Sequence, residues 1–176
     1  PHLKIAAGRY LSPAMDYSLF FIALPVLLMS VVVHEVAHAV MARREGDDTA
    51  YRLGRITLNP IPHLDPVGSV FVPLLLLALP GNFIFGWAKP VPVNPGNYRD
   101  PVGGDIRVSL AGIVSNLALA ALFTVLLALF QWLASTAPGL AGVLAVLSQA
   151  AFSGLFINLI LAFFNLIPIP PLDGSH

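Results

Sequence analysis

The sequence predicts an all-α polytopic membrane protein, with a three-helix core and a re-entrant segment of short β-strands between the first and second core helices. Of its 176 residues, 57% are hydrophobic and only 10% are charged, and the mean hydropathy is +0.82. A soluble domain usually carries about 25% charged residues. This chain has too little charge to cover a surface that faces water, so we expect its partner to be a lipid bilayer.

Three stretches are long and apolar enough to cross a bilayer, which takes about 20 residues. They cover residues 17–42, 108–132 and 144–167. Between Arg107 and Asp173 there is no Lys, Arg, Asp or Glu, and Pro138-Gly139 is a turn signal between the last two stretches. The last two spans are therefore predicted to form a hairpin.

A fourth apolar stretch, residues 67–87, is interrupted by proline and glycine, and its hydrophobic centre at 70–79 is short. A run of that length is typical of a re-entrant segment rather than a span. Residues 52–59 and 88–93 are predicted to be short extended segments beside it, since the prolines in 88–93 exclude a helix. No repeat or linker divides the chain, so residues 1–176 are predicted to form a single domain, with its core at about 17–176.

The placement of the charges predicts the topology. Seven of the nine Lys and Arg residues fall between the first and second spans, so this region should be cytoplasmic by the positive-inside rule. That requires residues 67–87 to enter and leave the membrane on the same side. Lys4 and Arg9 would then lie outside, and residues 1–16 lack the pattern of a signal peptide.

Composition also excludes several classes of function. The formal net charge is zero, so no nucleic-acid partner held by phosphate contacts is expected. The chain has no cysteine, which excludes disulfides and Cys-type zinc sites. A metal site in this chain must be built from His, Asp or Glu.

The sharpest motif is His34-Glu35-Val36-Ala37-His38, inside the first apolar span. Histidines four residues apart lie on one face of a helix, where both imidazoles can reach one ion, and the glutamate between them can act on a nearby water. The alternative is a chance match with solvated side chains. Ionisable groups at membrane depth cost about 2.5–3.5 kcal/mol each on insertion scales unless they are paired or functional, which favours a catalytic zinc site.

Asp173 is the candidate third ligand. It follows the third span after Pro168, Pro170 and Pro171, which must end the helix. Irregular backbone is tolerated at membrane depth only when it is buried in protein or lines a cavity. A helix end with an ordinary capping Asp in water is the alternative. With three spans, His38 and Asp173 approach the same membrane face, so the predicted topology and ligand set depend on each other.

Asn116, in the second span, is a candidate catalytic residue. Its amide can donate a hydrogen bond to the oxyanion that develops at a scissile carbonyl. Equally, an Asn in a membrane helix can join neighbouring helices, and the residues alone leave both readings open. Asn158 and Asn165 on the third span are predicted to contribute to helix packing or to support other site residues.

Together, these residues resemble the site-2 protease family of intramembrane zinc metalloproteases. The resemblance runs from about Ser30 to His176 and rests on the 34–38 motif with Asn165, Pro168 and Leu172-Asp173-Gly174 downstream. The stretches 55–60, 63–68 and 85–94 are similar to further family segments. Ile113 stands where the family's Gly-Pro-x-x-Asn element has proline. Relatives often continue with another helix after the Asp-Gly element, so we expect a chain truncated after His176.

The resemblance implies a three-helix catalytic core. Because water must reach the site, and because the charged region is expected to be cytoplasmic, we expect a multi-pass protein of the cell membrane with a polar cavity open to the cytoplasm. His34, His38 and Asp173 would hold one zinc ion, Glu35 would be the general base, and Asn116 the oxyanion donor. The expected reaction is hydrolysis of peptide bonds in or near transmembrane segments of membrane-anchored regulatory proteins. We expect an extended segment near 56–58 or 91–93 to receive the unwound substrate by strand addition. The alternatives are a metal-binding membrane transporter and a non-catalytic scaffold that binds membrane helices.

Overall fold

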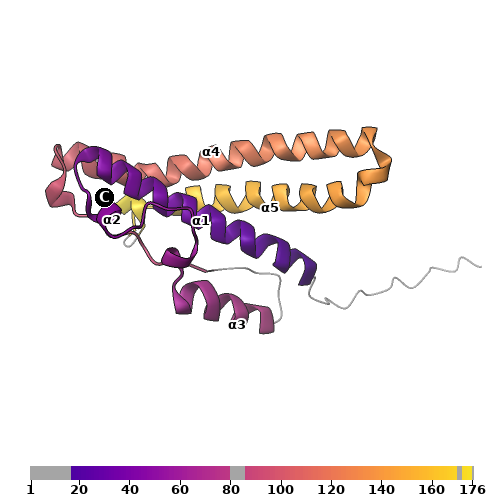
Figure 1. Cartoon of the computed structure of the whole chain (residues 1–176), viewed down its shortest axis with the longest axis horizontal. Helices are drawn as coiled ribbons and strands as arrows, with labels where there is room; N and C mark the ends of the chain where they lie inside the picture. Colours follow the sequence, from indigo (N-terminus) through magenta and orange to yellow (C-terminus); the bar gives the residue numbers. More distant parts are fainter. Residues whose placement is uncertain (1–16, 80–85, 170–171, 176) are drawn as a thin grey trace, which may run out of the picture.

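The computed structural model describes residues 17–79, 86–169 and 172–175 of the chain. Three long helices dominate it: α1 (Tyr17–Glu45), α4 (Pro101–Thr136) and α5 (Ala141–Asn165) (Figure 1). By length and composition each of them can cross a membrane, which confirms the three predicted helices. The short elements are α2 (Thr49–Arg52), η1 (Ile61–His63), η2 (Pro66–Phe71), α3 (Val72–Ala78), η3 (Pro95–Asn97), η4 (Pro138–Leu140) and η5 (Asp173–Ser175).

Helices α4 and α5 form an antiparallel hairpin that is joined by η4 (Figure 1). The Asp100 side chain caps α4 by accepting a hydrogen bond from the Gly103 N–H at 3.0 Å, and Pro101 occupies the first helical position. Both are typical helix-start features. Because of them, α4 begins seven residues before the apolar stretch that predicted it.

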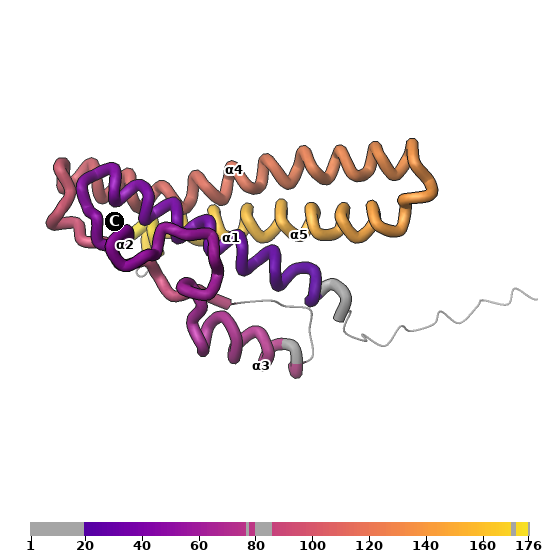
Figure 2. Tube along the Cα trace, viewed as in Figure 1, coloured from indigo at the N-terminus to yellow at the C-terminus, as the bar shows by residue number. Residues whose placement is uncertain are grey.

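Helix α1 crosses the hairpin where α4 begins and α5 ends (Figure 2). Small and polar residues lie at the contacts within the hairpin and between the hairpin and α1, as is usual between membrane helices. A Cβ atom on Gly154 of α5 would collide with the Phe123 ring of α4. The buried Asn158 of α5 donates a hydrogen bond to Ser30 Oγ of α1 at 2.8 Å, so the expected packing role of Asn158 is present.

The outer faces of the hairpin expose large apolar side chains. They include Val114, Leu122 and Trp132 on α4, and Phe152, Phe156 and Phe163 on α5. Exposing these apolar side chains to water would be unfavourable, whereas contact with lipid tails is favourable. The backbone N–H and C=O groups of a helix are already hydrogen-bonded within the helix, as a lipid environment requires. The described structure is therefore consistent with an all-α membrane protein.

The strands expected at 52–59 and 88–93 do not form, because the described ranges 17–79, 86–169 and 172–175 contain helices, turns and irregular segments only. In 88–93 the peptide groups bind other partners instead of a strand. The Lys89 N–H donates to the His63 carbonyl oxygen at 2.8 Å, and the Arg55 guanidinium donates to the Lys89 carbonyl oxygen at 2.7 Å. Pro90 and Pro92 have no N–H to offer a ladder.

Helices η2 and α3 follow one another over six and seven residues. Together they reach only about 20 Å, which is shorter than a hydrocarbon core of about 30 Å. The Asp65 side chain begins η2 by accepting from the N–H groups of Val67 and Gly68. Three features of the sequence lie outside the described residues. They are the predicted interruption at Pro80 and Gly81, the prolines Pro170 and Pro171 after α5, and residues 1–16, which were predicted to lack a signal peptide.

Candidate metal centre

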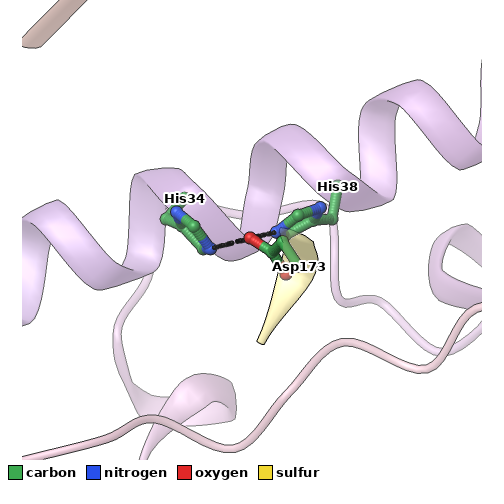
Figure 3. A group of neighbouring side chains, drawn as sticks. All are labelled: His34, His38 and Asp173. Carbon is green, nitrogen blue, oxygen red and sulfur yellow. Dashed lines mark hydrogen bonds and ion pairs between the residues drawn. The ribbon is translucent and has the colours of Figure 1, made fainter. Parts of the chain in front are cut away.

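The structure brings the three predicted ligands together. His34 and His38 lie one turn apart on α1, and their Nε2 atoms are 3.0 Å apart. Asp173 Oδ2 lies 3.1 Å from His34 Nε2 and 3.2 Å from His38 Nε2 (Figure 3). One ligand atom from each residue falls within 4.8 Å of the other two, so the group could hold a metal ion.

The hydrogen bonds of His38 suit a cation at this point. Its Nδ1 lies 2.7 Å from the carbonyl oxygen of Val108 on α4. A carbonyl oxygen only accepts, so Nδ1 carries the hydrogen and Nε2 of the neutral ring presents its lone pair. This lone pair faces Asp173 Oδ2, a buried oxygen without a hydrogen-bond donor in the described structure. A cation would satisfy both atoms, and nitrogen with carboxylate oxygen is a donor set that zinc accepts.

The charge state of Asp173 also suits a cation. Burial raises the pKa of its carboxyl group, but the close pairing with the His34 and His38 rings outweighs burial and holds this pKa below its ordinary value. The group is therefore ionised at neutral pH. An ionised carboxylate is the form that binds a metal ion.

The chain after α5 must fold back sharply to place Asp173 under α1. Helix α5 ends at Asn165, and η5 begins at Asp173. A Cβ atom on Gly174 would lie 2.6 Å from the Leu166 carbonyl oxygen, so only glycine allows this approach. The Leu172-Asp173-Gly174 sequence therefore places the carboxylate through a close backbone contact.

Gly112 of α4 faces the histidine pair and was not assigned a role from the sequence. A Cβ atom there would lie 2.6 Å from His34 Nε2 and in collision with His38 Nε2. Any side chain at this position would occupy the space of the metal cluster. Its place in the Gly-x-x-x-Asn spacing before Asn116 is the signal that could have identified it.

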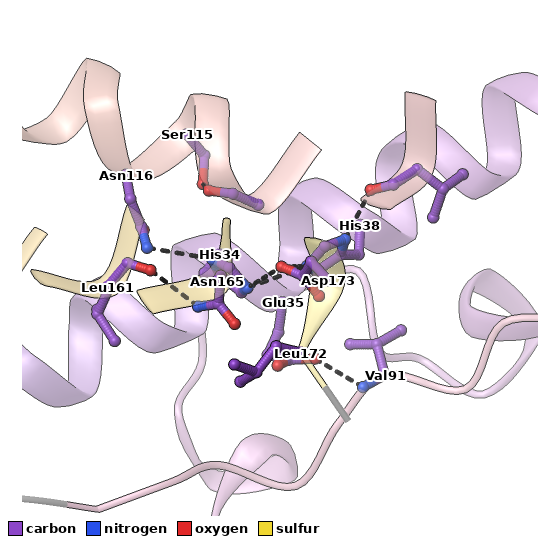
Figure 4. A network of polar contacts seen from close by, with 12 residues as sticks. His34, Glu35, His38, Val91, Ser115, Asn116, Leu161, Asn165, Leu172 and Asp173 are labelled. Carbon is purple, nitrogen blue, oxygen red and sulfur yellow. Dashed lines mark hydrogen bonds and ion pairs between the residues drawn. The ribbon is translucent and has the colours of Figure 1, made fainter. Parts of the chain in front are cut away.

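Glu35 lies beside the cluster in a cavity of about 390 Å³. The cavity is lined by the three candidate ligands and by Glu35, Trp87, Val91, Ser109 and Phe164, among others. The Val91 N–H donates to Glu35 Oε2 at 2.7 Å (Figure 4). That N–H is already in use, so a peptide that pairs with residues 91–93 would have to use other groups of the segment.

Asn116 is buried and points at His34 rather than into the cavity (Figure 4). Its Nδ2 lies 3.1 Å from His34 Nδ1, and the described residues that line the cavity do not include it. Asn165 donates to the Leu161 carbonyl oxygen of its own helix at 3.0 Å. The Asn116 amide therefore does not face the space beside Glu35 and Asp173 where a substrate carbonyl would lie, whereas Asn165 does line that cavity.

The fold and the site define a helical membrane protein with a candidate metal centre. Its sequence is 44% identical over 153 residues to Putative zinc metalloprotease YwhC of Bacillus subtilis. The aligned residues cover 84% of this chain and 63% of that protein. It is 34% identical to Rip2 of Mycolicibacterium smegmatis, over 96% of this chain and 60% of that protein. It is 27% identical to MJ0611 of Methanocaldococcus jannaschii, over 93% of this chain and 72% of that protein.

All three relatives carry the zinc metalloprotease name, so the similarity supports a family of zinc metalloproteases. The chain spans 63% and 60% of the length of the first two. No protein-family model matches the chain, and no solved structure matches it.

Proposed function

We propose that this chain is the catalytic core of an intramembrane zinc metalloprotease of the site-2 protease type. The observation that carries the proposal is the convergence of His34 and His38 of α1 with Asp173 of η5, with Glu35 on the same cavity. The named zinc metalloproteases among its relatives support the metal and the reaction class. The substrates are membrane-anchored regulatory proteins, cut in or near their transmembrane segments.

In this proposal one zinc ion per chain is held by His34 Nε2, His38 Nε2 and an Asp173 carboxylate oxygen. When bound, zinc lowers the pKa of a water to about 7 and polarises a carbonyl oxygen. The Val108 carbonyl oxygen holds the His38 ring through Nδ1. Such outer contacts commonly fix the orientation of a metal-binding histidine.

Glu35 is the general base. Its carboxylate takes a proton from the water that attacks the scissile carbonyl carbon, and then delivers that proton to the leaving amine as the C–N bond breaks. The Val91 N–H holds one of its oxygens, so the carboxylate keeps a fixed position beside the cavity. The products are a free carboxylate and a free amine.

The charges near the cluster support a cytoplasmic active site in a multi-pass protein of the cell membrane. Arg43 and Arg44 lie in the last turn of α1, and Arg107 near the start of α4 pairs with Glu45 at 2.7 Å. These residues lie at the end of the bundle that holds Asp173, whereas the η4 turn has no charged residue. The short η2–α3 unit, in this proposal, enters and leaves the membrane on that same side.

One experiment tests the function. The chain is purified in detergent, its bound zinc is measured, and cleavage of a transmembrane peptide is followed by mass spectrometry. We expect one zinc per chain and cleavage that Glu35→Gln abolishes while zinc remains bound. Zinc binding without Glu35-dependent cleavage would support a transporter or a scaffold instead.

A further inference from the structure

We propose that Asn116 is a positioning residue that fixes the tautomer and orientation of His34, and that it is not the oxyanion donor. The inference rests on the proposed zinc site. It starts from the contact between the buried Asn116 side chain on α4 and the Nδ1 atom of His34 on α1, at 3.1 Å.

The direction of His34 decides which of its nitrogens is free for a metal. Its Nε2 points to Asp173 Oδ2 at 3.1 Å, and its Nδ1 points away to Asn116. An Nε2 atom that binds a metal must give up its hydrogen, so the neutral ring then carries its hydrogen on Nδ1. The partner of Nδ1 must accept a hydrogen bond in that state.

For His38 the acceptor of the Nδ1 hydrogen is a backbone carbonyl oxygen, because Nδ1 faces the carbonyl oxygen of Val108. For His34 the amide of Asn116 can serve, since one end of an amide donates and the other accepts. Rotation of the amide by 180° places Oδ1 against His34 Nδ1. Asn116 Oδ1 is buried without a hydrogen-bond partner in the described structure, and this rotation gives it one. The contact of Nδ2 with His34 Nδ1 is given up in exchange, at the point where Nδ1 gains its hydrogen and can no longer accept.

An amide therefore holds the ring in one orientation in both states. Nδ2 donates to Nδ1 while Nε2 carries the hydrogen, and Oδ1 accepts from Nδ1 once Nε2 binds zinc. A leucine of similar size would fill the volume but leave Nδ1 unpaired in a buried site, which costs free energy in the zinc-bound state. Asn116 thus acts on the substrate only through His34.

The test measures zinc affinity by competition with a chromophoric chelator in detergent. We compare wild type with Asn116→Leu, which removes the acceptor, and Asn116→Asp, which keeps it. Asn158→Leu is the matched control, because Asn158 is equally buried and also contacts α1, but through Ser30. Cleavage of a transmembrane peptide is measured in parallel at saturating zinc.

Asn116→Leu is expected to weaken zinc binding by about 10- to 100-fold, and Asn116→Asp to keep the affinity within about threefold of wild type. At saturating zinc both variants should cleave within about tenfold of wild type. Asn158→Leu should bind zinc like wild type. If Asn116→Leu does not fold, the Asn116→Asp variant decides whether Asn116 is the oxyanion donor. Loss of an oxyanion donor in that variant would lower kcat by about 10²–10³ with zinc retained.

Wild-type zinc affinity in a folded Asn116→Leu variant would overturn the inference and leave the proposed protease intact. A loss of about 100-fold or more in kcat for Asn116→Asp at saturating zinc would also overturn it, in favour of the oxyanion role. A wild-type chain that binds no zinc would instead overturn the proposed function itself.

Discussion

The backbone N–H of Val91 lies 2.7 Å from Oε2 of Glu35 and donates a hydrogen bond to it. This contact joins the irregular segment before η3 to the centre of α1, across 56 residues of sequence. Val91 is also buried against Ala39 and Ala50, which keeps its peptide group in place. The candidate general base is thus held by a backbone group whose own position is fixed by packing.

Replacing Val91 with proline removes that N–H. Because a displaced catalytic group can cost about 100-fold in rate, we expect Val91→Pro to lower kcat by about 10- to 100-fold. Zinc binding should be unchanged, since Val91 contacts none of the candidate ligands in the described hydrogen bonds. Peptide cleavage at saturating zinc and chelator competition measure the two quantities.

Val91→Ala is the matched control, because it removes two methyl groups from the buried side chain and keeps the N–H. It should retain more than about a third of the wild-type kcat. Equal losses in both variants would mean that packing, and not the hydrogen bond to Glu35, explains the effect.

Gly112→Ala should weaken zinc binding without unfolding the protein. The added Cβ would meet His34 Nε2 at 2.6 Å, and overpacking of this kind costs about 1–3 kcal/mol, or roughly 5- to 150-fold in zinc affinity. Gly142→Ala on α5 is the control, since nothing lies within 4 Å of a Cβ atom there. Unchanged affinity in Gly112→Ala would show that α4 does not limit the space of the metal.

Asp47 should stabilise, in a pH-dependent way, the end of the bundle at which α1 ends and α4 begins. Its buried carboxylate accepts hydrogen bonds from the Asn94 N–H at 2.7 Å, the Asn97 amide at 2.8 Å and Thr49. Burial raises the pKa of Asp47, but the hydrogen bonds outweigh it and the pKa is lowered. Because the folded pKa lies below the unfolded one, this stabilisation is full above the unfolded pKa and is lost as the pH falls towards the folded pKa.

Asp47→Ala should therefore reduce the free energy of unfolding by about 1–3 kcal/mol at pH 7. The difference from wild type should shrink as the pH falls below about 4. Thermal unfolding in detergent, followed by circular dichroism at several pH values, measures it. A difference that stays constant or grows on acidification would contradict the role given to the carboxylate.

The proposed topology can be tested by single cysteines, because the chain has none of its own. Arg52 and Gly139 are both exposed and lie at opposite ends of the three-helix bundle. A membrane-impermeant maleimide should label Arg52→Cys in inverted vesicles and Gly139→Cys in intact spheroplasts. Labelling of both from one side would contradict three crossings with a cytoplasmic active site.

The three long helices and the ligand cluster were predictable from the sequence. Apolar length identified the helices to within a few residues at most ends, and the helical spacing of His34 and His38 placed both on one face. An odd number of spans then placed Asp173 at the same end. Each of these inferences depends on local periodicity or on the number of membrane spans, and both can be read from a single sequence.

The contacts around the cluster were not predictable in the same way. The position of Gly112 against the histidines and the direction of Asn116 depend on how α4 is rotated about its axis relative to α1, which periodicity does not determine. The strands predicted for 88–93 failed because Glu35, Arg55 and His63 supply the hydrogen-bond partners that a neighbouring strand would have supplied. Those partners are distant in sequence.

The most direct test of the metal centre is X-ray absorption at the zinc edge on the purified chain. We expect one zinc per chain with two imidazole nitrogens and carboxylate oxygen at about 2.0–2.2 Å, and loss of the carboxylate contribution in Asp173→Ala. Zinc coordinated without imidazole, or with a spectrum that Asp173→Ala leaves unchanged, would contradict the site.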